Sequence, residues 1–466
     1  MVARKKLVAG VKRCNEQGAA LGGLALVALV SAGLAGCGTA EPSRDTAPPP
    51  ASAFGPAPSS TLAAPPVSMG ISMLNPTPVS EQPAVVDTSM LAMPEPMPTP
   101  RGPVPEPPLT AAEQAELAAF DGLVRAPEWS APVASAISEV MVQRAYLDWK
   151  ARFYASCDDG TVYVLKNDYT GSEEVVSEGI GYGMLLSVAV GDREVFDGLW
   201  RYYREHRNGN GVMNWRQAVC GGQTGGNGAS DADLDAALGL VLGDSRWGGY
   251  AQDARDLIDA IGANETEQCD NGTIVLKPGD SWGGCGGQTV NPSYFSPGHY
   301  RRFAQVQTER ADFWNEFATD TYAMLSRMQD DKDGLIPDWA FGDGRSEDGD
   351  RGQFGYEAVR NPWRVALDYA WTGNASAKTF LQRMSQAVDG RGGLTALADA
   401  EDFEDKRNSA FLGSLSLSGS GVSAEKLETY VREWQAYEDM DDEWYYQATL
   451  RVLFLMAAGG FFPASY

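Results

Sequence analysis

Residues 177–184 read Ser-Glu-Gly-Ile-Gly-Tyr-Gly-Met and place one carboxylate beside glycines at alternate positions. Glycine has no side chain to block a ligand, and it tolerates backbone conformations that other residues avoid. A long apolar run begins at Met184, so we expect Glu178 at the start of a helix, with the ring of Tyr182 close by. Burial on one side raises the pKa of such a carboxyl group toward a proton-donating value. Glu178 is therefore a candidate general acid.

The composition limits the classes of function. The chain has 466 residues, which is enough for one large domain or two ordinary ones. Its net charge of −25 argues against a nucleic-acid partner, because phosphate binding needs clustered Lys and Arg. With only 2 His residues, a His-rich zinc site is not expected, and we predict neither a metal nor a cofactor.

Residues 1–37 have the pattern of an export signal. Several Lys and Arg residues precede a short apolar run at 21–34, which is too short to span a membrane comfortably. The run ends Leu-Ala-Gly-Cys, which resembles the lipobox of bacterial lipoproteins and implies cleavage before Cys37 and lipid on its sulfur. We expect a protein anchored in the outer membrane or at the cell surface; an ordinary secretory signal is the alternative.

Residues 38–108 change in composition to Pro, Ala, Ser, Thr and Met. Such a segment cannot bury enough apolar surface to offset the entropy lost on ordering. We interpret it as a disordered, semi-extended linker. The globular domain then occupies residues 109–466.

The pattern of the globular domain is helical throughout, because apolar residues recur at three- and four-residue spacing. The predicted helices are 184–190, 194–203, 234–242, 251–261, 313–328, 363–371, 425–437 and 444–456. Residues 161–165 form one short candidate strand, and loops rich in Gly, Asn and Asp lie at 221–228 and 342–352. We predict an all-α toroid of helices whose functional face is built from loops.

Four cysteines lie in this domain: Cys157, Cys220, Cys269 and Cys285. Exported proteins meet an oxidising compartment, so disulfides are expected, although four cysteines allow three pairings. We favour Cys269 with Cys285, which flank one loop. A metal site of four thiolates is the alternative, but it lacks any Cys-x-x-Cys pair.

Carboxylates and aromatic rings recur together in Gly-rich settings. The acidic candidates are Glu178, Asp231 in the Ala-Ser-Asp-Ala-Asp run at 229–233, and Glu357. The flat rings that could stack on sugars are Tyr182, Trp215, Trp282, Tyr294 and Tyr356. Two carboxyl groups that face one bond, with aromatic rings along a groove, are what glycoside hydrolysis needs. A neutral polysaccharide has to be held by stacking and hydrogen bonds.

Each acidic residue also has a purely structural interpretation. Glu178 could be a helix-dipole partner or a capping-box residue. Asp231 could cap the helix that starts near residue 234, and we interpret Asp233 as structural. Glu357 could pair with Arg360 or Arg364 in a salt bridge along a helix.

Four segments resemble the motifs of family 8 of the glycoside hydrolases, in the order of that family. They are the runs at 177–184 and 229–233, Asn-Pro-Ser-Tyr-Phe at 291–295, and Tyr-Glu-Ala-Val-Arg-Asn-Pro-Trp-Arg at 356–364. The resemblance covers the domain from about residue 135 onward. It implies an (α/α)6 barrel, inversion at the anomeric carbon, and cleavage inside β-1,4-linked chains such as cellulose, lichenan, xylan or chitosan.

The resemblance also implies roles for single residues. Glu178 matches the general acid, Asp231 the carboxylate that binds and distorts the sugar, and Tyr294 a tyrosine near the nucleophilic water. Glu357 stands at the position of the general base, where the family usually has Asp. Arg360, the arginine just after it, is a candidate substrate-binding residue. A Glu reaches one methylene further, and an inverting site holds its carboxyl groups about 6.5–9.5 Å apart. Either the backbone sits slightly back at Glu357, or the base lies elsewhere.

We therefore expect an inverting, endo-acting endo-β-1,4-glucanase. Xylanase and chitosanase are the alternatives within the family, and a non-catalytic polysaccharide-binding surface lipoprotein is the alternative from another class. The expected partner is a β-1,4-linked polysaccharide, with membrane contact only through the lipid anchor. We expect a monomer.

Overall fold

The computed structural model describes residues 107–126, 128–399, 408–436 and 444–465. These residues belong to one compact unit, Met93–Tyr466. The predicted export signal, Cys37 and all but the last two residues of the predicted linker lie outside the described residues. Within the described ranges, we find no helix with the length and apolar character needed to cross a bilayer.

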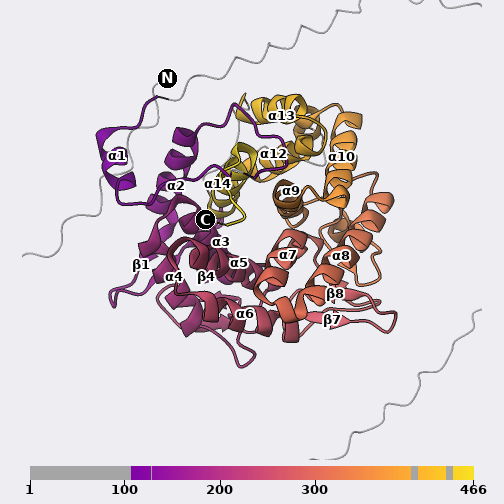
Figure 1. Ribbon diagram of the computed structural model, residues 1–466, viewed down its shortest axis with the longest axis horizontal. Helices are drawn as coiled ribbons and strands as arrows, with labels where there is room; N and C mark the ends of the chain where they lie inside the picture. Colours follow the sequence, from indigo (N-terminus) through magenta and orange to yellow (C-terminus); the bar gives the residue numbers. More distant parts are fainter. Residues whose placement is uncertain (1–106, 127, 400–407, 437–443, 466) are drawn as a thin grey trace, which may run out of the picture. The chain divides into compact units, whose positions relative to one another are not determined.

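A closed ring of inner helices forms the centre of this unit (Figure 1). Each inner helix contacts the next, and the last contacts the first. The inner helices are α3 (Ser177–Val190), α5 (Ser230–Trp247), α7 (Pro297–Val306), α9 (Asn361–Thr372), α12 (Ser409–Ser416) and α14 (Tyr445–Gly459). Most of their side chains are buried, which explains their nearly continuous apolar sequences.

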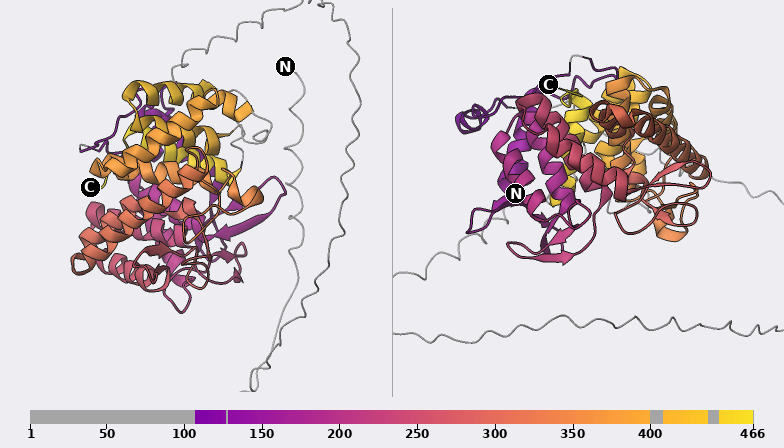
Figure 2. Two further views of the ribbon diagram at one scale, coloured as in Figure 1. Left: turned by 90° about the vertical axis from the view of Figure 1, so that its right-hand side faces the viewer. Right: turned by 60° about the horizontal axis from the view of Figure 1, so that its bottom comes forward.

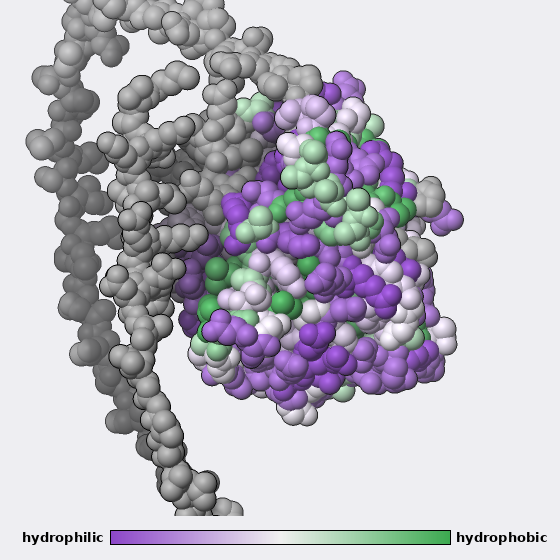
Figure 3. All heavy atoms as spheres, turned by 90° about the vertical axis from the view of Figure 1, so that its left-hand side faces the viewer, coloured by the Kyte–Doolittle hydropathy of each residue, from purple (hydrophilic) through white to green (hydrophobic). Residues whose placement is uncertain are grey.

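An outer layer of helices surrounds this ring. Each packs against the inner helix that precedes it in the chain, except that α2 packs against α14. The outer helices are α2 (Glu139–Phe153), α4 (Arg193–Glu205), α6 (Ala251–Asn264), α8 (Ala311–Asp331), α10 (Ala375–Gly390) and α13 (Ala424–Ala436). They bury one face only, and the face around α1 (Ala111–Leu117), α2 and α4 is mainly hydrophilic (Figure 3). This arrangement is the (α/α)6 barrel, and the prediction of an all-α fold is confirmed.

Short antiparallel strands occur in the long connections that lead from an outer helix to the next inner helix. The pairs are β1 (Tyr154–Ser156) with β2 (Val162–Val164), β7 (Thr266–Gln268) with β8 (Ile274–Leu276), and β9 (Thr289–Val290) with β10 (Ala340–Phe341). A four-stranded sheet has the order β3 (Lys166–Asn167), β4 (Glu173–Val176), β5 (Arg216–Gln217) and β6 (Gln223–Gly225). The strand predicted at 161–165 is β2. The strands and long loops gather at one end of the ring (Figure 2).

Single-turn helices complete the described elements. They are η2 (Pro292–Tyr294), η3 (Thr308–Arg310), η4 (Gly349–Gly352), η5 (Ala358–Arg360) and η7 (Leu417–Gly421), together with α11 (Leu394–Asp399). The inner-to-outer connections are much shorter than the outer-to-inner ones; residues 191–192 join α3 to α4, whereas residues 265–296 join α6 to α7. The long connections therefore supply most of the exposed loop surface at one end.

The glycines at 177–184 have a different role from the expected one. Helix α3 begins at Ser177 rather than near residue 184, so these glycines lie inside a regular helix. A Cβ on Gly181 would lie 2.8 Å from the carbonyl oxygen of Ala232 in α5, and one on Gly183 would lie 2.5 Å from Cδ1 of Leu199 in α4. The glycines are needed because neighbouring helices approach closely, not because a ligand or a left-handed backbone requires them.

Both disulfides tie loops at the end that carries the strands. Cys269 pairs with Cys285 across a separation of 16 residues, as predicted, and the loop that they close carries Trp282. Cys157, which follows β1, pairs with Cys220, which follows β5. The alternative of a four-thiolate metal site is therefore wrong.

Candidate active site

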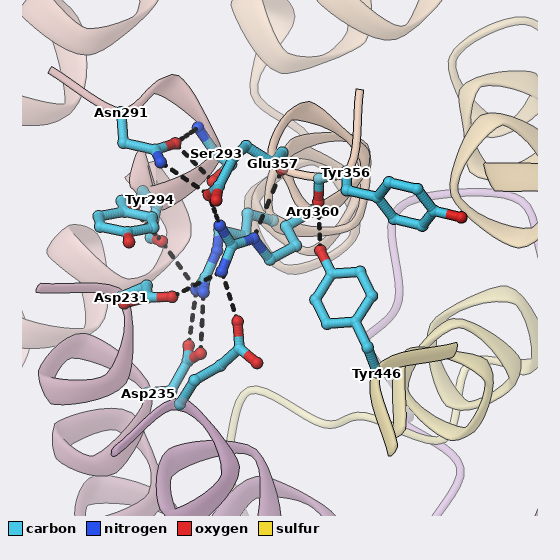
Figure 4. Close-up of polar contacts among 12 residues, drawn as sticks. Asp231, Asp235, Asn291, Ser293, Tyr294, Tyr356, Glu357, Arg360 and Tyr446 are labelled. Carbon is cyan, nitrogen blue, oxygen red and sulfur yellow. Dashed lines mark hydrogen bonds and ion pairs between the residues drawn. The ribbon is translucent and has the colours of Figure 1, made fainter. Parts of the chain in front are cut away.

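The N-terminal ends of several inner helices meet and bring the acidic candidates together. Glu178 lies in the first turn of α3, Asp231 lies in the first turn of α5, and Arg360 immediately precedes α9. Figure 4 shows Asp231, from α5, meeting Glu357 and the Arg360 guanidinium, which both come from the segment around η5. A helix N-terminus carries partial positive charge, which favours carboxylates at this end of the ring.

Arg360 is the common partner of all three predicted carboxylates. Its Nη1 lies 2.6 Å from Oε2 of Glu178 and 2.8 Å from Oδ2 of Asp231. Its Nη2 donates to Oε2 of Glu357. The salt bridge between Glu357 and Arg360, which we gave as a structural interpretation of Glu357, is thus present. It belongs to a larger cluster that also contains Glu178 and Asp231. The arginine side chain is only 4% exposed, so its guanidinium is shielded from water, whereas the Glu357 side chain is 33% exposed.

The surroundings of Glu178 suit a proton donor. Burial raises its pKa, Arg360 opposes this effect, and the charge of Glu357 adds to it. Arg360 can only donate hydrogen bonds, so Oε2 of Glu178 is always an acceptor. The other oxygen, Oε1, accepts a hydrogen bond from the hydroxyl of Tyr445 at 3.0 Å. Because a hydroxyl can also accept, the proton of an uncharged Glu178 belongs on Oε1.

Asp231 has one oxygen that no described residue satisfies. Its side chain is 3% exposed, and Oδ2 is bound by Arg360, whereas buried Oδ1 has no hydrogen-bond partner in the described chain. Leaving a buried acceptor unpaired costs about 1–3 kcal/mol, so this oxygen is suited to a hydroxyl of a ligand. Burial raises the pKa of Asp231, while Arg360 opposes this effect.

Asp233, two residues further on, faces away into a structural network. Its Oδ1 accepts the backbone N–H of Met213 at 3.2 Å and the hydroxyl of Tyr203. Burial raises the pKa of Asp233 to about 6, and the neighbouring carboxyl of Glu265 lowers it by hydrogen bonding. The structural interpretation of Asp233 agrees with these contacts.

Glu357 stands on a turn that is fixed by a residue the sequence did not single out. Oδ1 of Asp338 accepts the backbone N–H of Gly355 and that of Ala358, each at 2.8 Å. These two bonds hold both sides of the segment that carries Tyr356 and Glu357. Burial, together with the charge of Glu357, raises the pKa of Asp338 to about 6, although the two backbone hydrogen bonds oppose this effect. The Glu357 side chain itself is 33% exposed and can reach a ligand.

A second buried ion pair lies beneath this cluster and fixes α9 against α5 (Figure 4). Arg364 places Nη1 2.6 Å and Nη2 2.8 Å from the two oxygens of Asp235, and Nε2 of His299 lies 2.9 Å from Asp235. Burial alone would raise the pKa of Asp235, but Arg364 and His299 outweigh it, so the pKa is lowered. Asp235 lies one helical turn after Asp231, so this pair helps to fix the orientation of the cluster around Arg360.

Three of the predicted rings are exposed, and all three lie in connections that lead from an outer helix to an inner helix. Trp215 is 39% exposed, Trp282 is 42% exposed and Tyr356 is 38% exposed. The carbonyl of Trp215 accepts the backbone N–H of Ser177 at the start of α3, and Tyr356 directly precedes Glu357. These rings have surface available for stacking on a sugar.

Two further predicted rings lie deeper. Tyr294 is partly buried, with the Arg360 guanidinium carbon 5.1 Å from its ring centre. Tyr182 has no exposed surface and packs edge-on against buried Trp363, with 6.4 Å between ring centres. The expectation that Tyr182 stacks on a substrate is therefore wrong, because regular helix α3 turns its ring into the core.

Several residues of the site were missed in the sequence. Asn291 donates to Glu357 and lay inside a quoted motif, but only Tyr294 of that motif was assigned a role. Tyr445 is 267 residues from Glu178, and nothing in its local pattern indicates the contact. Trp339, whose ring centre lies 5.9 Å from that of Trp282, follows Asp338 in a loop.

No group of three or more His, Cys, Asp or Glu side chains in the described ranges is arranged to hold a metal ion. The polar groups that meet at this site are carboxyl groups, a guanidinium and hydroxyls. A proton donor with raised pKa, a second exposed carboxylate and nearby stacking rings can carry out acid–base hydrolysis of a glycosidic bond.

Comparisons with known proteins agree with this chemistry. The sequence model of Glycosyl hydrolases family 8 matches residues 129–460. Endoglucanase A of Acetivibrio thermocellus is 34% identical over 340 residues, covering 69% of this chain and 70% of its own. Endoglucanase C of Ruminiclostridium cellulolyticum is 31% identical over 345 residues, covering 71% of this chain and 73% of its own.

Solved structures show the same fold. The β-1,3-1,4-glucanase of Paenibacillus sp. X4 superposes with a TM-score of 0.60 at 24% identity, covering 73% of this chain and 96% of that one. A reducing-end-xylose-releasing exo-oligoxylanase superposes with a TM-score of 0.58 at 21% identity, covering 69% of this chain and 92% of that one. The family match spans most of the globular domain, and the chain belongs to family 8 of the glycoside hydrolases.

Proposed function

We propose that this glycoside hydrolase is an inverting, endo-acting endo-β-1,4-glucanase. The observation that carries the proposal is the meeting of Glu178, Asp231 and Glu357 around the one guanidinium of Arg360, with exposed rings in the long outer-to-inner connections. The relatives named endoglucanases, with 31–34% identity, support the choice of β-glucan.

In the proposed reaction, Glu178 and Glu357 act on opposite faces of the sugar. Water attacks the anomeric carbon while Glu357 takes its proton, and the glycosidic C–O bond breaks as Glu178 gives its proton to the leaving oxygen. Glu178 becomes a carboxylate in this step. Arg360, which already binds Oε2 at 2.6 Å, stabilises that new charge without having to move.

Asp231 and Tyr294 complete the proposed site. The unpartnered Oδ1 of Asp231 accepts a hydroxyl of the sugar at the point of cleavage and holds its ring in a distorted form. In its ionised form, which the Arg360 guanidinium favours, Asp231 stabilises the positive charge that develops on the ring. Tyr294, against the face of Arg360, is assigned to the water side of the site.

Substitution of the two carboxyl groups tests the acid and base roles. We expect Glu178→Gln and Glu357→Gln each to lower kcat on β-glucan by about 10²–10⁴-fold, because general acid–base catalysis contributes about that much. An aryl cellobioside with a 2,4-dinitrophenolate leaving group needs no protonation, so it should restore activity to Glu178→Gln but not to Glu357→Gln. Near-wild-type release of reducing sugar from β-glucan by Glu178→Gln would refute the acid assignment.

The product itself tests the stereochemistry. An inverting enzyme releases the α-anomer from a β-linked chain, which proton NMR of fresh product detects before mutarotation. The β-anomer as first product would contradict inversion, and the absence of any new reducing end would favour the non-catalytic alternative.

Xylan is the second candidate substrate. A reducing-end xylose-releasing exo-oligoxylanase of Bifidobacterium adolescentis is 27% identical over 247 residues. Initial rates on carboxymethylcellulose, lichenan, xylan and chitosan separate glucanase, xylanase and chitosanase. A higher kcat/KM on xylan than on either glucan would overturn the glucanase proposal.

We also propose that the protein is exported and anchored through lipid on Cys37. The lipobox-like residues 34–37 motivate this proposal, and two disulfides support an oxidising compartment. Incorporation of labelled palmitate into the full chain, and its loss in Cys37→Ser, tests the anchor. Equal membrane recovery of both forms would contradict it.

A further inference from the structure

The amide of Asn291 has a fixed orientation toward Glu357. Its Oδ1 accepts the backbone N–H of Ser293 at 3.0 Å and the Ser293 hydroxyl at 2.6 Å. A backbone N–H can only donate, so the oxygen end of the amide must face Ser293. The NH₂ end therefore faces Glu357, where Nδ2 lies 2.8 Å from Oε2 (Figure 4).

Both protein donors to Glu357 bind the same oxygen. Nη2 of Arg360 also donates to Oε2, and no described residue donates to Oε1. Two donors draw charge onto Oε2 and hold the carboxylate plane in place. Oε1 is left as the oxygen that can accept a proton from water.

Asn291 cannot act by touching the substrate directly. Asn291 is only 1% exposed, and it directly precedes η2, the turn that carries Tyr294. Any effect of the Asn291 side chain on the reaction must therefore pass through the groups that it contacts, which are Ser293 in η2 and Glu357, and Glu357 is the one with solvent-exposed surface.

We infer that Asn291 is the positioning residue of Glu357 and that Oε1 of Glu357 is the proton-accepting atom. This inference rests on the proposed function, in which Glu357 is the general base. A Glu side chain has one more rotatable bond than the Asp that is usual at this position, and loses more entropy when it is held. The Asn291 amide, with Arg360, holds this longer side chain in one orientation. The water proton passes to Oε1 as the bond from its oxygen to the anomeric carbon forms and the glycosidic bond breaks.

The Asn291→Asp variant isolates this contact. It keeps an acceptor for Ser293 but places a carboxylate oxygen, in place of an N–H donor, against Oε2 of Glu357. A like charge raises the pKa of the base, so the acidic limb of the kcat/KM profile should move to higher pH by about one unit or more. KM at the optimum should stay within about twofold, because transition-state positioning rather than ground-state binding is lost.

A second variant and a matched control accompany it. Asn291→Ala removes the donor without adding charge, and misplacement of the base should lower kcat by about 10–100-fold. Asn271→Asp makes the same chemical change in the exposed β7–β8 turn, where Oδ1 of Asn271 accepts the N–H of Thr273. It should leave the pH profile of the wild type unchanged.

Glu357→Ala, assayed with and without azide, separates this inference from the proposed function. Loss of hydrolysis and formation of an α-glycosyl azide support Glu357 as the base, whereas hydrolysis at nearly the wild-type rate would remove the base assignment itself. If Glu357→Ala is inactive and Asn291→Asp keeps the wild-type acidic limb, the role of Asn291 is overturned. Should Asn291→Asp not fold by circular dichroism, wild-type kcat in Asn291→Ala would overturn it equally.

Discussion

The hydroxyl of Tyr445 lies 3.0 Å from Oε1 of Glu178, the carboxylate oxygen that Arg360 does not bind. The contact depends on the missing side chain of Gly179, since a Cβ there would lie 3.1 Å from the Tyr445 hydroxyl. Tyr445 starts helix α14 and is only 1% exposed. The acid is therefore held from two sides, by a guanidinium on one oxygen and a phenol on the other.

We expect this contact to set the pH range of the proposed general acid, Glu178. The Tyr445 hydrogen bond lowers the pKa of Glu178, against the larger effect of burial, which raises it. Tyr445→Phe should therefore raise this pKa by about one unit, since a hydrogen bond to a charged group is worth about 1.5–3 kcal/mol. A general acid must be protonated to act, so the alkaline limb of the kcat/KM profile should move to higher pH. An unchanged alkaline limb would show that this bond does not tune the acid.

Close helix packing under the site should be sensitive to one added methyl group. In Gly181→Ala, the new Cβ would meet the carbonyl oxygen of Ala232 at 2.8 Å, next to Asp231. Backbone must shift to relieve this contact, so we expect a loss of about 1–3 kcal/mol in unfolding free energy and a lower kcat. Denaturant unfolding measures the first effect. Gly390→Ala is the matched control: it ends α10 in open space and should lose no stability.

The positions of the acidic residues could be predicted because their local sequences are distinctive. Glu178, Asp231 and Glu357 each stand beside glycines or aromatics at the start of a helix, and the order of the motifs indicated a single family. Their roles remain predictions, but the structure brings all three to Arg360. The predicted start of α3, residue 184, lies after its true start at Ser177, because the glycines between these positions indicated a loop.

Residues that act through long-range contacts could not be predicted in this way. Asp338 fixes the turn of Glu357 through backbone N–H groups 17 and 20 residues away, and Tyr445 reaches Glu178 across the closed ring. Tyr182 was misassigned for the opposite reason. Its ring looked available beside small residues, but those glycines bring neighbouring helices close and seal the ring in the core.

A buried pair of carboxyl groups should make stability fall as the pH rises. Burial raises the pKa of Glu265 well above its usual range, the charge of Asp233 adds to this, and the residue has no exposed surface. A folded-state pKa above the unfolded value means that stability is complete below the unfolded pKa and is lost as the pH rises toward the folded pKa. We expect the midpoint temperature of thermal unfolding to decrease as the pH rises from about 5 to about 8.

Glu265→Gln tests the source of this loss. The amide can still donate a hydrogen bond to Asp233 but does not titrate, so the variant should match the wild type near pH 4 and exceed its thermal midpoint near pH 8. The comparison is a series of melts across this range. Parallel curves for the two proteins would show that another group causes the loss.

Glu357→Asp introduces the residue that is usual at this position in the family, and we expect it to impair the enzyme. The present contacts fit the longer side chain: Asn291 Nδ2 lies 2.8 Å from Oε2, and Arg360 binds the same atom. Asp338 fixes the backbone of this turn, so the shorter carboxylate would withdraw from both donors and from the water. Misplacement of this size should lower kcat by about 10–100-fold, with KM little changed. Steady-state rates on β-glucan measure this effect. A kcat equal to or above that of the wild type would mean that the turn can move to place either carboxylate against the water. The contacts of Asn291, Arg360 and Asp338 would then not favour Glu over Asp.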